Sequence, residues 1–402
     1  MSKKKNTDSK LQGINRITVD ATIELTDLVE NMHKRIVHPP FLPSTPVQHL
    51  ITNIAGVVYK NIRWGTKLMG NGADRALRQF APYISDIKST EKREGIRSVL
   101  NGLVGDYLKR TDNPLQIEMQ FKNNGKNINL TKKGISRISP KVGSSILLMI
   151  HGSCLNDQNW SHNKHNHGAV LAKDFNKTPV YLKYNSGLHV SENGQQLNTF
   201  LKKLFSKWPV PVEEIRVIAH SMGGLVLRSA LYYGQKENQV WTKSTKQIFF
   251  LGTPHQGAPL EKAGNYVEVL LNTIPYAKPF ARLAKIRGAG VTDLRYGNLL
   301  DEDWQDIDQH KIKGDNRTHV PLPVNIDCYT IAAVTSKETT KRMKLLQSDG
   351  MVDLKSALGR HKKSSKNLKF QKEKTLVVYG CNHVELLSNQ EVFVQLQKWF
   401  VN

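Results

Sequence analysis

The stretch IRVIAHSMGGLVLRS, residues 215–229, decides the fold of this chain. A run rich in β-branched residues stops at a lone serine, Ser221, and a helical pattern begins at once with two glycines. The five residues from Ala219 to Gly223 nearly fit the pattern Gly-x-Ser-x-Gly, with alanine in the first small position. A serine at the start of a helix is often only a cap, so this pattern needs partners before it indicates a nucleophile.

Apolar runs on both sides of this stretch alternate with helical patterns. Buried strands are predicted at 144–153, 179–184, 215–219, 247–252, 326–334 and 375–380, after a hairpin at 115–130. The clearest amphipathic helix between them covers 196–208, and a final helix ends in LQKWFV. Strands that alternate with helices predict an α/β fold with a mostly parallel, doubly wound sheet.

The remaining segments predict the domain organisation. Residues 1–15 form a basic tail, and amphipathic stripes over 25–36 and 96–108 predict a helical region up to about residue 113. The α/β domain is therefore expected to cover 114–402. Within it, residues 258–323 are rich in proline, glycine and charge and predict an insertion over one end of the sheet. Its apolar segment VEVLLNTIPYAKPF makes this insertion lid-like.

The partners that Ser221 needs occur downstream in a suitable order. Ligands of a parallel sheet bind beyond the carboxyl ends of its strands, where Ser221 is expected. A nucleophilic serine needs a histidine base and an orienting carboxylate, which in this architecture follow in the order acid, then histidine. Asp349 lies in an Asp-Gly turn after the 326–334 strand, and His383 follows the last strand. Asp353, four residues after Asp349, is an alternative acid.

The predicted site also needs an oxyanion hole, formed by two backbone N–H groups that bind the developing negative charge. One is expected from Met222, directly after the nucleophile, and the other from Ser153, in the loop that follows LLMIHG (147–152). His151 is expected to shape that loop, and His220 to pack or to form a hydrogen bond.

Five motifs in this order resemble the α/β-hydrolase superfamily and, within it, the lipase and GPI-inositol-deacylase-like group. They are IHGSCLNDQNW, AHSMGG, FLGTPHQGAPL, SDGMVDLKSALG and NHVELLS, and the resemblance covers roughly residues 114–402. It implies an α/β-hydrolase fold, with Ser221 as nucleophile, Asp349 as acid, His383 as base, and Ser153 and Met222 as oxyanion donors. Ala219 departs from the glycine that is usual in the motif.

The net charge and the number of cysteines limit which partners and which cellular compartment fit the sequence. The formal net charge of +24 favours anionic partners, either a membrane surface or a nucleic acid. Nucleic acid is disfavoured because no reading helix or set of stacking aromatics accompanies the charge. The chain has three cysteines, no signal-peptide pattern and no apolar run of membrane-spanning length. We therefore expect a cytosolic protein, with peripheral contact to an anionic membrane left open.

Three functions remain open at this point. The favoured one is a serine hydrolase that cleaves carboxylic esters, of lipid or acyl type, through an acyl-enzyme and without a cofactor. An acyltransferase that uses the same triad is the near alternative, and a non-catalytic protein that binds anionic surfaces is the distant one. The cluster His162, His165 and His167 suggests zinc, but only Asp157 accompanies it as a further ligand type. No metal site is expected, because a serine triad needs none.

Overall fold

The computed structural model describes residues 90–138, 142–258, 288–305, 315–337 and 347–401. The predicted tail at 1–15, the predicted helix at 25–36 and much of the predicted insertion lie outside these residues. Among the described residues, no helix combines the length and apolarity that crossing a membrane requires.

In the described part of the chain, eight strands form one sheet, in the order β2-β1-β4-β3-β5-β6-β7-β8. The strands are β1 Gln120–Asn123, β2 Lys126–Asn127, β3 Ser145–Ile150, β4 Thr178–Lys183, β5 Glu214–His220, β6 Thr245–Leu251, β7 Asp327–Val334 and β8 Thr375–Tyr379. The pairs β1–β2 and β1–β4 are antiparallel, and every other neighbouring pair is parallel. The predicted mostly parallel sheet is confirmed, with strand ends that differ from the expected ones by a few residues.

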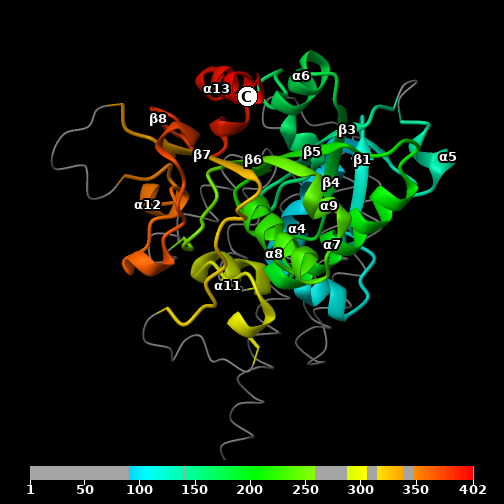
Figure 1. The fold of residues 1–402 in the computed structure, drawn as a ribbon. Helices are drawn as coiled ribbons and strands as arrows, with labels where there is room; N and C mark the ends of the chain where they lie inside the picture. The colour runs from blue at the N-terminus through cyan, green and yellow to red at the C-terminus, as the bar shows by residue number, and fades with distance from the viewer. Residues whose placement is uncertain (1–89, 139–141, 259–287, 306–314, 338–346, 402) are drawn as a thin grey trace, which may run out of the picture.

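Helices cover both faces of the sheet, as a doubly wound fold requires. In Figure 1, α7 and α8 lie on one face, and α6 and α13 lie on the other. The helices are α4 Thr90–Arg110, α5 Lys132–Ile135, α6 His167–Asp174, α7 Val190–Lys207, α8 Met222–Lys236, α9 Val240–Ser244, α11 Ala289–Tyr296, α12 Leu354–Ala357 and α13 Gln390–Val401. Short 3-10 turns are η1 Asp157–Trp160, η3 Asp301–Asp303, η5 Ser364–Lys366, η6 Lys372–Lys374 and η7 Glu385–Leu387.

The helix α4 lies against the loops that leave the carboxyl ends of β3 and β4. Its Gly102 faces Cys154 in the loop after β3, and the side-chain amide of Asn185, after β4, donates to the Gly105 carbonyl at 3.0 Å. Apolar residues of α4, such as Leu100 and Leu103, are buried in the core that the sheet also lines. The division of the chain near residue 113 stays a prediction, and α4 itself packs onto the α/β core.

The central strands end level with one another, which fixes where the site lies. In the parallel register, Ala219 of β5 is opposite Ile150 of β3 and Phe250 of β6. The three loops that follow these strands therefore leave the sheet at one point of its carboxyl edge. This is the place where parallel sheets bind ligands.

Candidate active site

Ser221 forms a strained turn between β5 and α8. Its backbone has φ 54° and ψ −126°, a conformation that residues with a side chain rarely adopt. The Ser221 N–H donates to the Leu251 carbonyl of β6 at 2.8 Å, which holds the turn against the neighbouring strand. The side chain is buried, and its hydroxyl oxygen has no hydrogen-bond partner within the described ranges. A serine that only caps a helix would use this oxygen on the helix N–H groups, and Ser221 does not.

His383 and Asp349 form a buried pair at the same edge. The His383 Nδ1 donates to the Asp349 Oδ2 at 2.6 Å, and the His383 N–H donates to the Asp349 carbonyl at 3.0 Å. The second carboxylate oxygen accepts the N–H groups of Met351 and Val352, at 2.9 and 2.7 Å. The carboxylate partner of His383 is therefore Asp349 and not Asp353. The ring nitrogen Nε2 of His383 is buried and bonds to no residue in the described part of the chain, so it can exchange a proton.

Backbone contacts bring His383 and Ser221 to the same end of β6. Ser221 bonds to Leu251, and the next residue, Gly252, lies against the imidazole of His383. A Cβ at Gly252 would stand 3.1 Å from ring atoms of His383, and its φ of 58° also favours glycine. From the other side, His220 Nε2 donates to the His383 carbonyl at 3.0 Å, which ties the base to the residue before the serine.

The loop after β3 passes directly beside Ser221. A Cβ placed on Gly152 would stand 2.9 Å from the Cβ of Ser221. The next N–H group, of Ser153, donates to no residue that the structure describes, whereas the Cys154 N–H is taken by the Ser186 hydroxyl at 3.0 Å. Met222 is the first residue of α8, where N–H groups have no partner within the helix. Two candidate oxyanion donors thus flank the serine.

Three buried histidines around this edge stay neutral at physiological pH. Burial lowers the pKa of His151 to about 3, and it lowers the pKa of both His220 and His255 well below the ordinary value. The His151 ring stacks on Tyr184, and the Tyr184 hydroxyl donates to the His151 carbonyl at 2.9 Å. These residues shape the loops without adding positive charge beside His383.

The histidine-rich loop before α6 bonds to the segment that follows His383. His165 donates to His167 at 2.8 Å, and His167 donates through Nε2 to the Leu386 carbonyl at 3.0 Å. His162 bonds to the Ser388 hydroxyl at 2.8 Å. Within the described ranges, no three histidine, cysteine or acidic side chains are grouped as metal ligands would be. The histidine-rich loop therefore helps to hold the turn that carries His383.

Sequence reasoning missed the contacts and the burial of Gly252, Thr253 and His255. In the sequence this segment was recognisable only as part of the motif FLGTPHQGAPL, which indicated no contact with His383. Gly252 packs on the His383 ring, while the hydroxyl of Thr253 and both ring nitrogens of His255 are buried without partners. This loop therefore contributes buried polar groups as well as the glycine that contacts His383.

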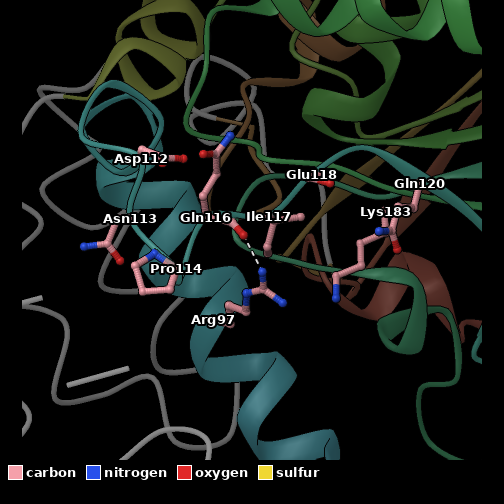
Figure 2. Close-up of a pocket in the computed structure, with 9 residues that line it drawn as sticks. All are labelled: Arg97, Asp112, Asn113, Pro114, Gln116, Ile117, Glu118, Gln120 and Lys183. Carbon is pink, nitrogen blue, oxygen red and sulfur yellow. Dashed lines mark hydrogen bonds between the residues drawn. The ribbon is translucent and has the colours of Figure 1, made fainter. Parts of the chain in front are cut away.

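A pocket of about 470 Å³ lies elsewhere, between α4 and the segment that leads into β1. Figure 2 shows Arg97 reaching from α4 to the Gln116 carbonyl, with Lys183 of β4 across the cavity. None of the five predicted site residues lines this pocket. The pocket and the candidate active site are separate features.

Comparisons with known proteins agree with the fold. Residues 143–323 match the family described as the PGAP1-like alpha/beta domain. Together with the sheet topology, this match confirms the predicted α/β-hydrolase fold and the resemblance to that group. No curated protein matches the chain in sequence.

Solved structures of similar fold include lipases and esterases. The mature lipase BlEst2 of Bacillus licheniformis is 16% identical over 63% of this chain and 91% of its own, with a TM-score of 0.42. A Pyrobaculum calidifontis esterase is 10% identical over 82% of this chain and 95% of its own, with a TM-score of 0.40. The Pyrococcus furiosus esterase Pf2001 is 15% identical over 64% and 80%, with a TM-score of 0.36.

Proposed function

We propose that the protein is a serine hydrolase that cleaves carboxylic esters. The α/β-hydrolase fold and the match of residues 143–323 to the PGAP1-like alpha/beta domain support this proposal. In this proposal Ser221 is the nucleophile, His383 the general base and Asp349 the orienting acid. The backbone N–H groups of Ser153 and Met222 hold the oxyanion. The enzyme forms an acyl-enzyme and needs no cofactor.

One observation carries the proposal. The hydroxyl of Ser221 and the Nε2 of His383 are both buried beside the end of strand β6, and neither has a hydrogen-bond partner among the residues that the structure describes. Leaving such a group unpaired costs on the order of 1 to 3 kcal/mol. A reaction in which the serine gives its proton to this nitrogen supplies a reason for the two groups to stay unpaired in the resting protein.

The proposed mechanism follows from the hydrogen bonds of the pair. Because His383 Nδ1 donates to Asp349, the neutral ring presents Nε2 as an acceptor for the serine proton. The Ser221 oxygen attacks the ester carbonyl, and the negative oxygen moves toward the N–H groups of Ser153 and Met222. The imidazolium then gives its proton to the leaving alcohol. Water repeats these steps on the acyl-enzyme and releases the carboxylic acid.

The proposed substrate carries an apolar acyl group and includes esters of lipid type. The apolar segment VEVLLNTIPYAKPF of the predicted insertion supports this part of the proposal. Peripheral contact with an anionic membrane is a further part of the proposal, supported by the net charge of +24. Acyl transfer to a second alcohol is the variant reaction, and a product analysis with an added alcohol acceptor separates it from hydrolysis.

The proposal is tested by removing the hydroxyl of Ser221. We expect Ser221→Ala to lower kcat for short p-nitrophenyl esters by about 10⁴-fold or more and to abolish labelling by a fluorophosphonate. Ser229→Ala is the matched control, because Ser229 is also buried in this region, on α8, with an unpaired hydroxyl. It should retain both activities.

The circular dichroism spectra of both variants should match the wild type, because neither change removes a hydrogen bond. Full activity of folded Ser221→Ala would exclude Ser221 as the nucleophile. Equal losses in the two variants would show that the effect is one of packing. If the wild type itself is neither active nor labelled, the non-catalytic binding protein becomes the better account.

A further inference from the structure

A strongly basic segment connects α12 to β8 on one flank of the molecule. Between residues 355 and 374 the sequence has a single acidic residue, Glu373, and eight basic ones, namely Lys355, Arg360, Lys362, Lys363, Lys366, Lys369, Lys372 and Lys374. Lys366 pairs with Asp315 at 3.3 Å, and Lys374 pairs with Asp327 at 2.6 Å. The segment therefore keeps a large surplus of positive charge.

Five cations of this segment form what we call the basic patch: Arg360, Lys362, Lys363, Lys369 and Lys372. All five are exposed, and none makes an ion pair with a residue that the structure describes. Most of the patch lies on one closed loop, because the Leu368 N–H donates to the Gly359 carbonyl at 2.9 Å. Holding like charges close together is unfavourable without an anionic partner.

The buried arginine beneath this flank adds to the positive potential. Arg228 of α8 is 5% exposed, and its guanidinium donates to the Val320 carbonyl at 2.5 Å. No carboxylate that the structure describes lies within ion-pair distance of it, and its Nε has no partner. Burial lowers the pKa of Arg228 to about 9, so the group remains charged at neutral pH.

Residues 321–324 line a pocket together with one lysine of the basic patch. The pocket has a volume of about 460 Å³, and its lining also includes Ser365, Asn367 and Lys369. Val324, in this lining, is 98% exposed, the most exposed large apolar side chain among those that the structure describes. An exposed aliphatic side chain in the same lining as a lysine fits an interfacial surface, with charge on the headgroups and the apolar side chain among them.

We propose that the flank formed by residues 319–328 and the basic patch binds the phosphate-bearing headgroups of an anionic membrane, with Val324 at the bilayer surface. The exposed valine favours a membrane over a nucleic acid, because nucleic-acid sites pair their charge with stacking aromatics or a reading element. The inference extends the membrane contact proposed above and does not depend on the catalytic triad.

Vesicle co-sedimentation of the full chain tests this assignment. The wild type should bind vesicles of phosphatidylcholine mixed equally with phosphatidylserine, should bind phosphatidylcholine alone poorly, and should lose binding as salt rises. The combined variant Lys362→Ala, Lys363→Ala and Lys369→Ala should lower the partition coefficient by about tenfold or more. Val324→Asp should lower it severalfold, because a carboxylate is repelled where the aliphatic tip was accommodated.

Matched controls remove the same chemistry from the opposite edge of the sheet. The combined variant Lys126→Ala, Lys132→Ala and Lys133→Ala takes three exposed lysines from β2 and α5, which Figure 1 places far from α12 and β8. Val240→Asp changes a valine that is 67% exposed at the start of α9. Both controls should bind vesicles like the wild type, and all four variants should hydrolyse a soluble ester at the wild-type rate.

Two outcomes would overturn the assignment. Equal losses from the patch variant and its lysine control would show that total charge, not this flank, drives binding. If the patch variant loses binding to a DNA fragment as well, while Val324→Asp still binds vesicles normally, the patch is a general polyanion site and not a membrane surface. Because vesicle binding is read without turnover, a protein that binds correctly but lacks esterase activity would contradict only the catalytic proposal.

Discussion

Two histidine–aspartate pairs in this molecule have similar chemistry and different surroundings. His383 and Asp349 join at 2.6 Å at the carboxyl edge of the sheet, and His189 and Asp293 join at 3.0 Å where α7 begins. Both aspartates are buried, and both histidines use Nδ1 for the bond. By residue types alone, either pair would qualify as part of a catalytic triad.

The surroundings of the two rings separate them. The ring of His189 stacks on Trp304 with centroids 3.5 Å apart, and Asp293 also accepts the Val190 N–H and the Asn298 side-chain amide. This pair joins α11 and the segment after it to the start of α7. The ring of His383 instead leaves Nε2 buried and unpaired at the strand end where Ser221 lies. A hydrogen-bonded histidine–aspartate pair thus indicates a catalytic role only when the Nε2 of the histidine is buried and has no hydrogen-bond partner.

Replacing each aspartate by asparagine should give the largest difference between the pairs. An amide at position 349 cannot stabilise the imidazolium, and it favours the wrong ring tautomer, so Asp349→Asn should lower kcat by about 10⁴-fold in the folded protein. Asp293→Asn should retain kcat but lower the free energy of unfolding by about 1 to 3 kcal/mol, because buried hydrogen bonds are mismatched. Ester kinetics and urea unfolding of both variants measure the two effects.

The opposite result would assign the catalytic role to the His189–Asp293 pair and the structural role to the His383–Asp349 pair. If Asp293→Asn lost turnover while Asp349→Asn lost only stability, the base would have to be His189. A loss of kcat in both variants, at normal stability, would mean that the α7–α11 junction controls the site from a distance.

A smaller difference is expected from the glycine beside each pair. Gly252 has φ 58° and contacts the His383 ring, while Gly297 has φ 72° at the end of α11 and donates its N–H to the Asp293 carbonyl. Gly252→Ala should displace the imidazole and lower kcat by up to about 10²-fold. Gly297→Ala would place its Cβ 2.7 Å from the Gly257 nitrogen, so it should lower the melting temperature and leave kcat of the folded protein unchanged. Equal kcat values in the two variants would contradict the assignment of Gly252.

The sequence predicted the parallel sheet because each buried strand is a continuous apolar run. The order of serine, acid and histidine was visible for a related reason, since each residue follows such a run. The start of α7 was predicted wrongly: the helix begins at Val190 and not at residue 196. Its first turns carry Ser191, Asn193 and Gly194, which are polar or small and still buried. Ser191 accepts a hydrogen bond from Trp304, in a distant segment, and Asn193 donates to the Asn185 carbonyl in the loop before the helix.

The contacts of His383 could not be predicted from the sequence, because its partners are also far away along the chain. The contact between Gly252 and His383, and the bond from His220 to the His383 carbonyl, join residues more than a hundred positions apart. Apolar periodicity reports which face of an element is buried, but it carries no information on which distant group meets that face. The sequence could therefore place the site at an edge, whereas the orientation of its rings required the folded chain.

The smallest effect concerns a buried histidine that has no carboxylate partner, His151. Burial lowers its pKa to about 3, whereas the unfolded chain takes up this proton below about pH 6.5. Between these values the unfolded state binds more protons, so the free energy of unfolding should fall on acidification, by about 1.4 kcal/mol per pH unit for this residue. His151→Phe retains the stack on Tyr184 and removes the titration, so it should flatten the slope by that amount in urea unfolding from about pH 6 to about pH 4. An unchanged slope would mean that His151 takes up its proton in the folded protein, and the neutral surroundings assigned to His383 would then need revision.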